Sequence, residues 1–254
     1  MKRYLFLLYG VISYLIFFGT ILYAIGFIGN IAVPKALDGP AVLPLWQALL
    51  INASLLGVFA VQHSVMARGW FKRWLTQYIP ETIERSTFVL ISSLLMIVLF
   101  WQWQPMGGEV WTVENPIARS VIWGFFFVGW TLLFTSTFLI NHFDLFGLRQ
   151  VWLAFQKRPY TELKFDIPIL YRMVRHPLYL GFIIAFWSTP TMTVTHLVFA
   201  LACTGYILVG IYFEEQDLVR RFGEGYRKYQ QQVPMLIPIS FRKRAKADGS
   251  SEAA

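Results

Sequence analysis

Charged residues are scarce in this chain of 254 residues, because Asp, Glu, Lys and Arg together make up only 14% of it. A soluble globular domain usually contains about 25% charged residues. The low value, together with 56% hydrophobic residues and a mean hydropathy of +0.52, excludes an ordinary soluble domain and indicates an integral membrane protein. In such a protein the net charge of +8 reflects basic cytoplasmic loops, and we expect no nucleic-acid partner.

Cysteine is almost absent as well. The single cysteine, Cys203, lies within an apolar run, so the chain cannot form a disulfide framework, and we interpret Cys203 as a small buried hydrophobic residue. The sequence also lacks a Walker loop, a G-x-G-x-x-G motif and any pair of histidines at the spacing of metal ligands. We therefore expect neither a phosphate-binding loop nor a metal centre.

Long apolar runs are plentiful and predict an all-α, polytopic bundle of membrane helices. A helix needs about 20 apolar residues to cross the hydrocarbon core. Four long spans are predicted, at 4–29, 43–66, 86–103 and 117–140. A helical hairpin follows, with arms at 178–187 and 194–213, and an amphipathic segment continues beyond it on the cytoplasmic side. Residues 241–254 are basic and then small and polar, which predicts a disordered tail.

Basic residues are distributed unevenly between the two sides that this topology defines. With the N-terminus in the cytoplasm, the outward loops are 30–42, 104–116 and 188–193. Only Lys35 and Arg119, of the 22 Lys and Arg residues, lie in or beside these loops. Because cytoplasmic loops carry an excess of Lys and Arg, this pattern predicts cytoplasmic N- and C-termini and an even number of crossings.

Ionisable residues gather at the cytoplasmic ends of the predicted spans. They are His63, His142, Asp144, His176, Glu214 and Glu215. Charged groups at membrane depth are costly and often mark a functional site. The alternative is that they only cap helix ends or snorkel to the surface, and that Asp144 only pairs with Arg149. We favour a shared site because the set includes two adjacent carboxylates and a His-Pro step.

The most distinctive motif is Arg175-His176-Pro177-Leu178-Tyr179-Leu180-Gly181, followed further along by Glu214-Glu215, Phe222-Gly223 and Tyr226. These residues, in this order, resemble the signature of membrane methyltransferases similar to isoprenylcysteine carboxyl methyltransferase. Phospholipid methyltransferases share the paired glutamates. Gln62-His63-Ser64, Glu84-Arg85-Ser86-Thr87 and the run 141–150 extend the resemblance over nearly the whole chain to the bacterial methanethiol S-methyltransferases. That family falls in a wider superfamily with the NnrU-like membrane proteins.

The resemblance implies methyl transfer from S-adenosylmethionine to methanethiol at the bacterial inner membrane, giving dimethyl sulfide. Either glutamate could bind the cofactor ammonium by a charge-assisted bond, and Arg175 or His176 could bind its carboxylate. Tyrosine rings could face the adenine or the sulfonium, and Gly181 allows close approach by backbone or ligand. The candidate cofactor residues are Arg175, His176, Tyr179, Gly181, Glu214, Glu215 and Tyr226.

Methyl transfer to sulfur requires a thiolate, whereas a free thiol is mostly protonated at neutral pH. A base must therefore favour ionisation. Our candidate catalytic pair is Asp144 with His142, and His63 is the alternative. A small lipophilic thiol would reach the site through the membrane lipid.

We expect residues 1–150 to form the substrate side and residues 151–240 the cofactor-binding hairpin and C-terminal segment. Two other enzyme classes stay open: an isoprenylcysteine or lipid methyltransferase, and a sterol-type reductase that uses NADPH. For the reductase, Arg220, Arg221, Arg227 and Lys228 could bind a 2′-phosphate. A small transporter or assembly factor would bind no S-adenosylmethionine. The sequence gives no oligomeric state.

Overall fold

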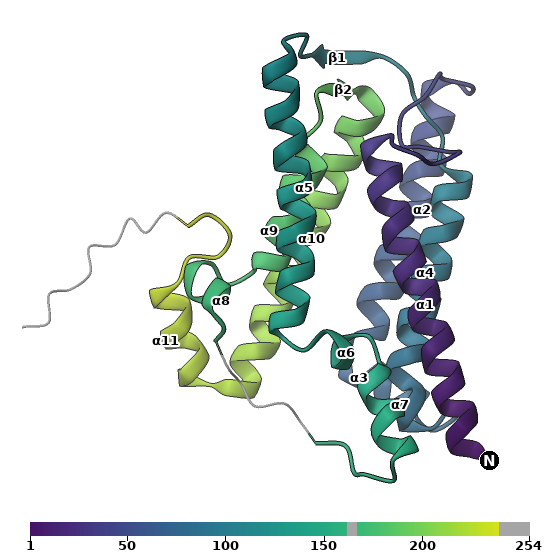
Figure 1. The fold of residues 1–254 in the computed structure, drawn as a ribbon, viewed down its shortest axis with the longest axis vertical. Coiled ribbons are helices and arrows are strands. Elements are labelled where there is room, and N and C mark those ends of the chain that lie inside the picture. The colour runs from purple at the N-terminus through teal and green to yellow at the C-terminus, as the bar shows by residue number, and fades with distance from the viewer. Residues whose placement is uncertain (162–166, 239–254) are drawn as a thin grey trace, which may run out of the picture.

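The computed structural model describes residues 1–161 and 167–238, and its main elements are long apolar helices (Figure 1). They are α1 (Lys2–Gly29), α2 (Leu45–Met66), α4 (Glu81–Gln102), α5 (Pro116–Leu139) and α10 (Val194–Phe222). Each of these five helices is long and apolar enough to cross a membrane. The predicted all-α, polytopic membrane bundle is therefore confirmed. The tail predicted at 241–254 lies outside the described residues.

Local signals set the ends of these helices. The side chain of Asn115 accepts hydrogen bonds from the backbone N–H groups of Ile117 and Ala118, and Pro116 occupies the first helical position of α5. Asn30 ends α1 in the left-handed conformation, with φ of 54°. One predicted boundary is too early: α10 continues to Phe222 instead of ending at residue 213. The paired glutamates therefore lie on a rigid helix rather than in a segment after it.

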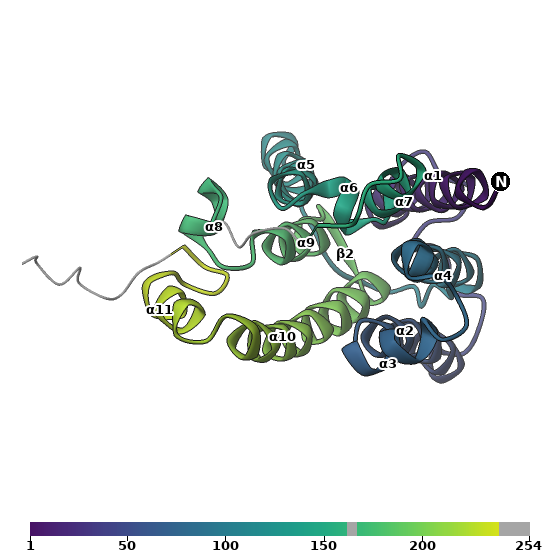
Figure 2. The same ribbon diagram turned by 90° about the horizontal axis from the view of Figure 1, so that it is seen from below.

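Short helices lie in the half of the bundle that holds the N-terminus, in two groups that are well separated (Figures 1 and 2). They are α3 (Gly69–Leu75), α6 (His142–Leu145), α7 (Leu148–Phe155), α8 (Ile169–Met173) and α11 (Glu224–Gln232). At the opposite end, β1 (Glu109–Thr112) and β2 (Thr191–Thr193) pair as a small antiparallel sheet that the sequence analysis did not predict. The sheet joins two of the loops predicted to face outward.

The first arm of the predicted hairpin is α9 (Pro177–Trp187), which lies between α5 and α10 (Figure 2). Its 11 residues span only about 16 Å, whereas the hydrocarbon core is about 30 Å thick. Residues 188–193 complete the path to the end of the bundle that holds β1 and β2, and the Pro190 carbonyl there accepts a hydrogen bond of 2.9 Å from the Val113 N–H. Non-helical backbone is tolerated at membrane depth where protein covers it.

Two glycines bring α5 and α9 into close contact. A Cβ added to Gly181 would lie 2.6 Å from the carbonyl oxygen of Gly129, and one added to Gly129 would lie 2.7 Å from that of Gly181. Small residues allow the backbones of membrane helices to approach in this way. The contact ties α9 to the first 150 residues.

Candidate functional site

Glu215 is the centre of a polar cluster at the junction of α9, α10 and α11. Its Oε1 accepts a hydrogen bond of 2.7 Å from Arg175 Nε and lies 3.0 Å from His176 Nε2. Its Oε2 accepts a bond of 2.9 Å from Gln230 Nε2. The side chains of Glu215 and His176 are only 16% and 4% exposed. Both carboxylate oxygens of Glu215 are thus engaged within the protein.

Arg175 and His176 also hold the chain segment that follows α11. Arg175 Nη1 donates to the carbonyls of Gln230 and Val233 at 3.0 and 2.6 Å. The backbone N–H groups of Arg175 and His176 donate to the carbonyls of Pro234 and Met235. The start of α9 is therefore fixed to α10 by the Glu215 side chain and to the C-terminal segment by backbone contacts.

Glu214 differs sharply from its neighbour. Its side chain is exposed, and its Oε2 accepts a hydrogen bond of 2.8 Å from the Tyr179 hydroxyl. Within the described part of the chain, Oε1 of Glu214 has no hydrogen-bond partner. Of the two adjacent carboxylates, Glu214 is therefore the one available to a cationic ligand.

Two tyrosines of α11 pack beside this cluster. Tyr226 and Tyr229 are 2% and 7% exposed, and their ring centroids lie 5.6 Å apart. Burial and the nearby Glu215 carboxylate raise the pKa of Tyr226. Burial also raises the pKa of Tyr229 to about 12, although Arg175 opposes this. The Tyr229 hydroxyl donates to the Tyr171 carbonyl, so these neutral rings brace α8 and α11.

Gly181 was proposed as a point of close approach by backbone or ligand. The structure places it against the backbone of α5, at Gly129 and Leu133. This helix contact accounts for the glycine without a cofactor. Arg220 and Arg227, considered for a 2′-phosphate, form ion pairs with Asp217 and Glu224 at 3.2 and 2.7 Å.

His142 lies in a separate cluster that links α6 to α1 and α5. Its Nδ1 lies 2.8 Å from Thr137 Oγ1, and its Nε2 lies 2.8 Å from the Tyr14 hydroxyl. Because the Thr137 hydroxyl donates to the Phe134 carbonyl, it accepts from His142 Nδ1–H. Nε2 of the neutral ring then accepts from Tyr14. Burial lowers the pKa of His142, which favours this neutral form.

The other two catalytic candidates have their own partners. Asp144 accepts a bond of 2.8 Å from Arg149 Nη1, so the surface ion pair weighed as an alternative is present. His63 Nδ1 lies 3.4 Å from Ser92 Oγ on α4. In the part of the chain that the structure describes, no hydrogen bond joins Asp144 to His142. None joins these three candidates to the Glu214–Glu215 pair either.

Sequence reasoning missed Gln230, Tyr14 and Thr137. Gln230 follows Tyr226 by four residues on α11, so helical spacing from the motif could have pointed to it. Tyr14 and Thr137 lie within apolar runs and give no comparable signal. Among the described residues, no group of three or more His, Cys, Asp or Glu side chains could hold a metal ion.

Comparison with known proteins places this sequence in a family. Residues 50–232 match the family model described as NnrU protein. The chain belongs to the NnrU family. The matched region contains the whole Glu215 cluster, from Arg175 to Gln230.

Several relatives of this NnrU-family protein match it over nearly their full length. A methanethiol S-methyltransferase of Mycobacterium tuberculosis is 53% identical over 242 residues, which cover 95% of this chain and 99% of the relative. A methanethiol S-methyltransferase of Crocosphaera subtropica is 54% identical, over 96% of this chain and 95% of the relative. Nurim of Rattus norvegicus is 26% identical, over 78% of this chain and 82% of the relative. No solved structure matches significantly.

Proposed function

We propose that this protein transfers a methyl group from S-adenosylmethionine to methanethiol and produces dimethyl sulfide. The observation that carries the proposal is the near-full-length similarity to relatives named methanethiol S-methyltransferase, at 53% and 54% identity. The Glu214 site supports it independently, because an exposed carboxylate beside a tyrosine suits a cationic ligand.

The residues present fit S-adenosylmethionine, which supplies an electrophilic methyl group on a sulfonium and also carries an ammonium and a carboxylate. Glu214 binds the ammonium through the oxygen that Tyr179 leaves available. Nε and Nη1 of Arg175 are engaged by Glu215 and backbone carbonyls, so Nη2 is the candidate for the carboxylate. Glu215, His176 and Gln230 position the site by holding α9, α10 and α11 together.

The thiol must lose its proton before its sulfur forms the new bond to carbon. His142 would take the proton through the Tyr14 hydroxyl, from which its Nε2 accepts, but it lies on α6 against α1 and α5. His63 lies on α2 next to Ser64, which contacts Tyr206 of α10, so it is the candidate on the helix beside α10. All three residues stay candidates. The variants Asp144→Asn, His142→Gln and His63→Gln distinguish them when turnover and cofactor affinity are measured separately.

We place the protein in the inner membrane with the Glu214 site on the cytoplasmic side. Lys2, Arg3 and the basic residues of α3, α7 and α11 lie at one end of the bundle, together with the N-terminus (Figure 1). The other end has Lys35 and Arg119. This distribution follows the positive-inside rule. It gives the site access to cytoplasmic S-adenosylmethionine and to a thiol dissolved in the bilayer.

Headspace gas analysis tests the proposed activity. Membranes containing the wild-type protein, supplied with S-adenosylmethionine and methanethiol, should release dimethyl sulfide, and matched membranes with Glu214→Ala should release far less. Absence of product from a wild type that binds the cofactor would refute methanethiol as the substrate. Absence of cofactor binding as well would refute the methyltransferase assignment.

A further inference from the structure

One face of α10 leads from Glu214 toward the middle of the membrane. Residues four apart share a helix face, and Tyr206, Gly210 and Glu214 have this spacing. Ile207 and Ile211 on the adjoining face are 7% and 1% exposed. The stripe formed by Tyr206, Gly210 and Glu214 therefore lies along the edge of the buried side, with Phe213, which is 42% exposed, on its other flank.

Two contacts place α2 beside this stripe. The Tyr206 hydroxyl lies 3.1 Å from Ser64 Oγ near the end of α2. Arg68, just after α2, forms an ion pair of 3.1 Å with Asp217 and lies over the Phe213 ring at 4.8 Å. The stripe is thus flanked by protein at both ends of the interval from residue 206 to residue 217.

Between these contacts the protein leaves open space. Among the residues that the structure describes, no atom lies within 4 Å of a Cβ added to Gly210, apart from its chain neighbours and the nearby backbone of α10. The next residue along the stripe is Glu214, whose side chain is exposed. A space next to an available carboxylate, on a face that adjoins buried residues, is suited to a ligand rather than to packing.

We propose that Gly210 sets the size of the acceptor thiol, because the space beside it receives the alkyl group of that thiol. This proposal rests on the proposed function. Four residues, about 6 Å of helix rise, separate Gly210 from Glu214. Three carbons separate the ammonium nitrogen from the sulfonium in S-adenosylmethionine, a comparable reach. With the ammonium at Glu214, the open space is therefore where an acceptor would meet the methyl group, and Tyr206 closes its far side.

Gly205 provides a matched control on the same helix. A Cβ added there also meets no atom of the described part of the chain within 4 Å. However, its face is shared with Leu201, Leu208 and Tyr212, which are 55%, 44% and 61% exposed. Ala at either position fits sterically and favours helix, so Gly205→Ala reproduces the backbone effect of Gly210→Ala outside the proposed pocket.

The experiment compares wild type, Gly210→Ala and Gly205→Ala in detergent or nanodiscs. It measures the KM for methanethiol and for ethanethiol, the Kd for S-adenosylhomocysteine and the Tm. Because one methyl group in a small pocket changes discrimination by about 10-fold or more, Gly210→Ala should raise the methanethiol KM by about that factor and the ethanethiol KM further. The Kd and Tm should match those of Gly205→Ala, whose KM values should equal the wild-type values.

Thiol KM values that are the same in Gly210→Ala and Gly205→Ala would overturn this inference while leaving the proposed function intact. A weaker S-adenosylhomocysteine Kd in Gly210→Ala, with unchanged thiol KM values, would assign the space to the cofactor and also overturn it. A wild type that makes no dimethyl sulfide would refute the proposed function, and this inference with it.

Discussion

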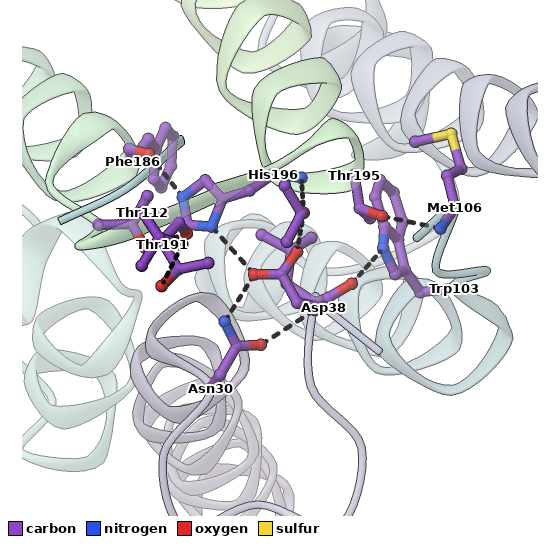
Figure 3. A network of polar contacts seen from close by, with 12 residues as sticks. Asn30, Asp38, Trp103, Met106, Thr112, Phe186, Thr191, Thr195 and His196 are labelled. Atoms are coloured by element: carbon purple, nitrogen blue, oxygen red, sulfur yellow. Dashed lines mark hydrogen bonds and ion pairs between the residues drawn. The ribbon is translucent and has the colours of Figure 1, made fainter. Parts of the chain in front are cut away.

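Polar clusters at the two ends of the bundle differ in how completely their groups are paired. At the end that is predicted to face outward, called the outer end below, Asp38 accepts from Asn30 Nδ2 at 2.7 Å and from the Thr193 hydroxyl, and lies 3.4 Å from His196 Nδ1 (Figure 3). His196 is 1% exposed, and its Nε2 lies 2.8 Å from the Phe186 carbonyl. At the other end, which holds the N-terminus, is predicted to be cytoplasmic and is called the cytoplasmic end below, Glu214 is exposed and has an open space one turn away.

The Asp38 network is therefore structural, whereas the cluster that contains Glu214 is a candidate site. The outer network connects loop 30–42 to β2 and to the first turn of α10, where it fastens the non-helical segment 188–193. Its polar side chains bond one another. In the cytoplasmic cluster Glu215 has the same closed character, and only its neighbour Glu214 offers an oxygen to a ligand. Ionisable residues in a membrane bundle therefore indicate a site when one of them is left accessible.

Glu214→Gln should have the largest effect on function. It removes the charge but keeps the shape, and hydrogen bonds to charged groups contribute about 1.5–3 kcal/mol. We expect cofactor affinity to fall by about 10- to 100-fold with no change in Tm, as measured by calorimetric titration with S-adenosylhomocysteine. Glu224→Gln on α11 is the matched control, because Glu224 is exposed and pairs with Arg227. Equal affinity in both variants would contradict the assignment.

Gly129→Ala tests the close contact between α5 and α9. Its new Cβ would lie 2.7 Å from the Ala185 nitrogen and from the Gly181 oxygen, both backbone atoms that cannot rotate away. Overpacking of this kind costs typically about 1–3 kcal/mol. We expect a clearly lower Tm than in Gly124→Ala, where the Cβ meets no atom of residues 1–161 or 167–238 within 4 Å. Similar melting of the two variants would show that α5 and α9 separate easily.

Much of this fold could be predicted from composition and apolar runs, because membrane helices must satisfy their backbone internally and carry long apolar sequences. The sheet of β1 and β2 could not, since its pairing joins loops far apart in the chain. Within the site, the order of the motif indicated that Arg175, His176 and the glutamates would meet. Which glutamate is exposed depended on the rotation of α10 and on the partner Gln230, neither of which the motif specifies.

The His142–Asp144 pair shows a second limit of sequence reasoning. The two residues are close in the chain, but Asp144 bonds Arg149 while His142 bonds Tyr14 and Thr137. Hydrogen-bond partners from distant helices decided these roles. His196, which the sequence left outside the site, lies in the outer network instead.

Asp38→Ala should lower stability without lowering the activity of the folded protein. It leaves Asn30, Thr193 and His196 without their shared acceptor, and of these only His196 is buried. An unsatisfied buried polar group costs about 1–3 kcal/mol. We expect a lower Tm and an unchanged Kd for S-adenosylhomocysteine below the transition. If Asp38→Ala lost cofactor affinity and kept its Tm, the Asp38 network would be a binding site and not a structural network.

The smallest expected effect is the pH dependence of the outer network. Burial alone would raise the pKa of the Asp38 carboxyl, but hydrogen bonds from His196, Thr193 and Asn30 outweigh it, so the pKa lies below its ordinary value. A depressed pKa in the folded state contributes stability above the unfolded pKa of about 3.9, and this contribution is lost as pH falls further. The Tm difference between wild type and Asp38→Asn should therefore be constant near neutral pH and shrink below about pH 4. A difference that persists at the acid limit would mean that hydrogen bonding by a neutral Asp38, rather than its charge, holds the loop to α10.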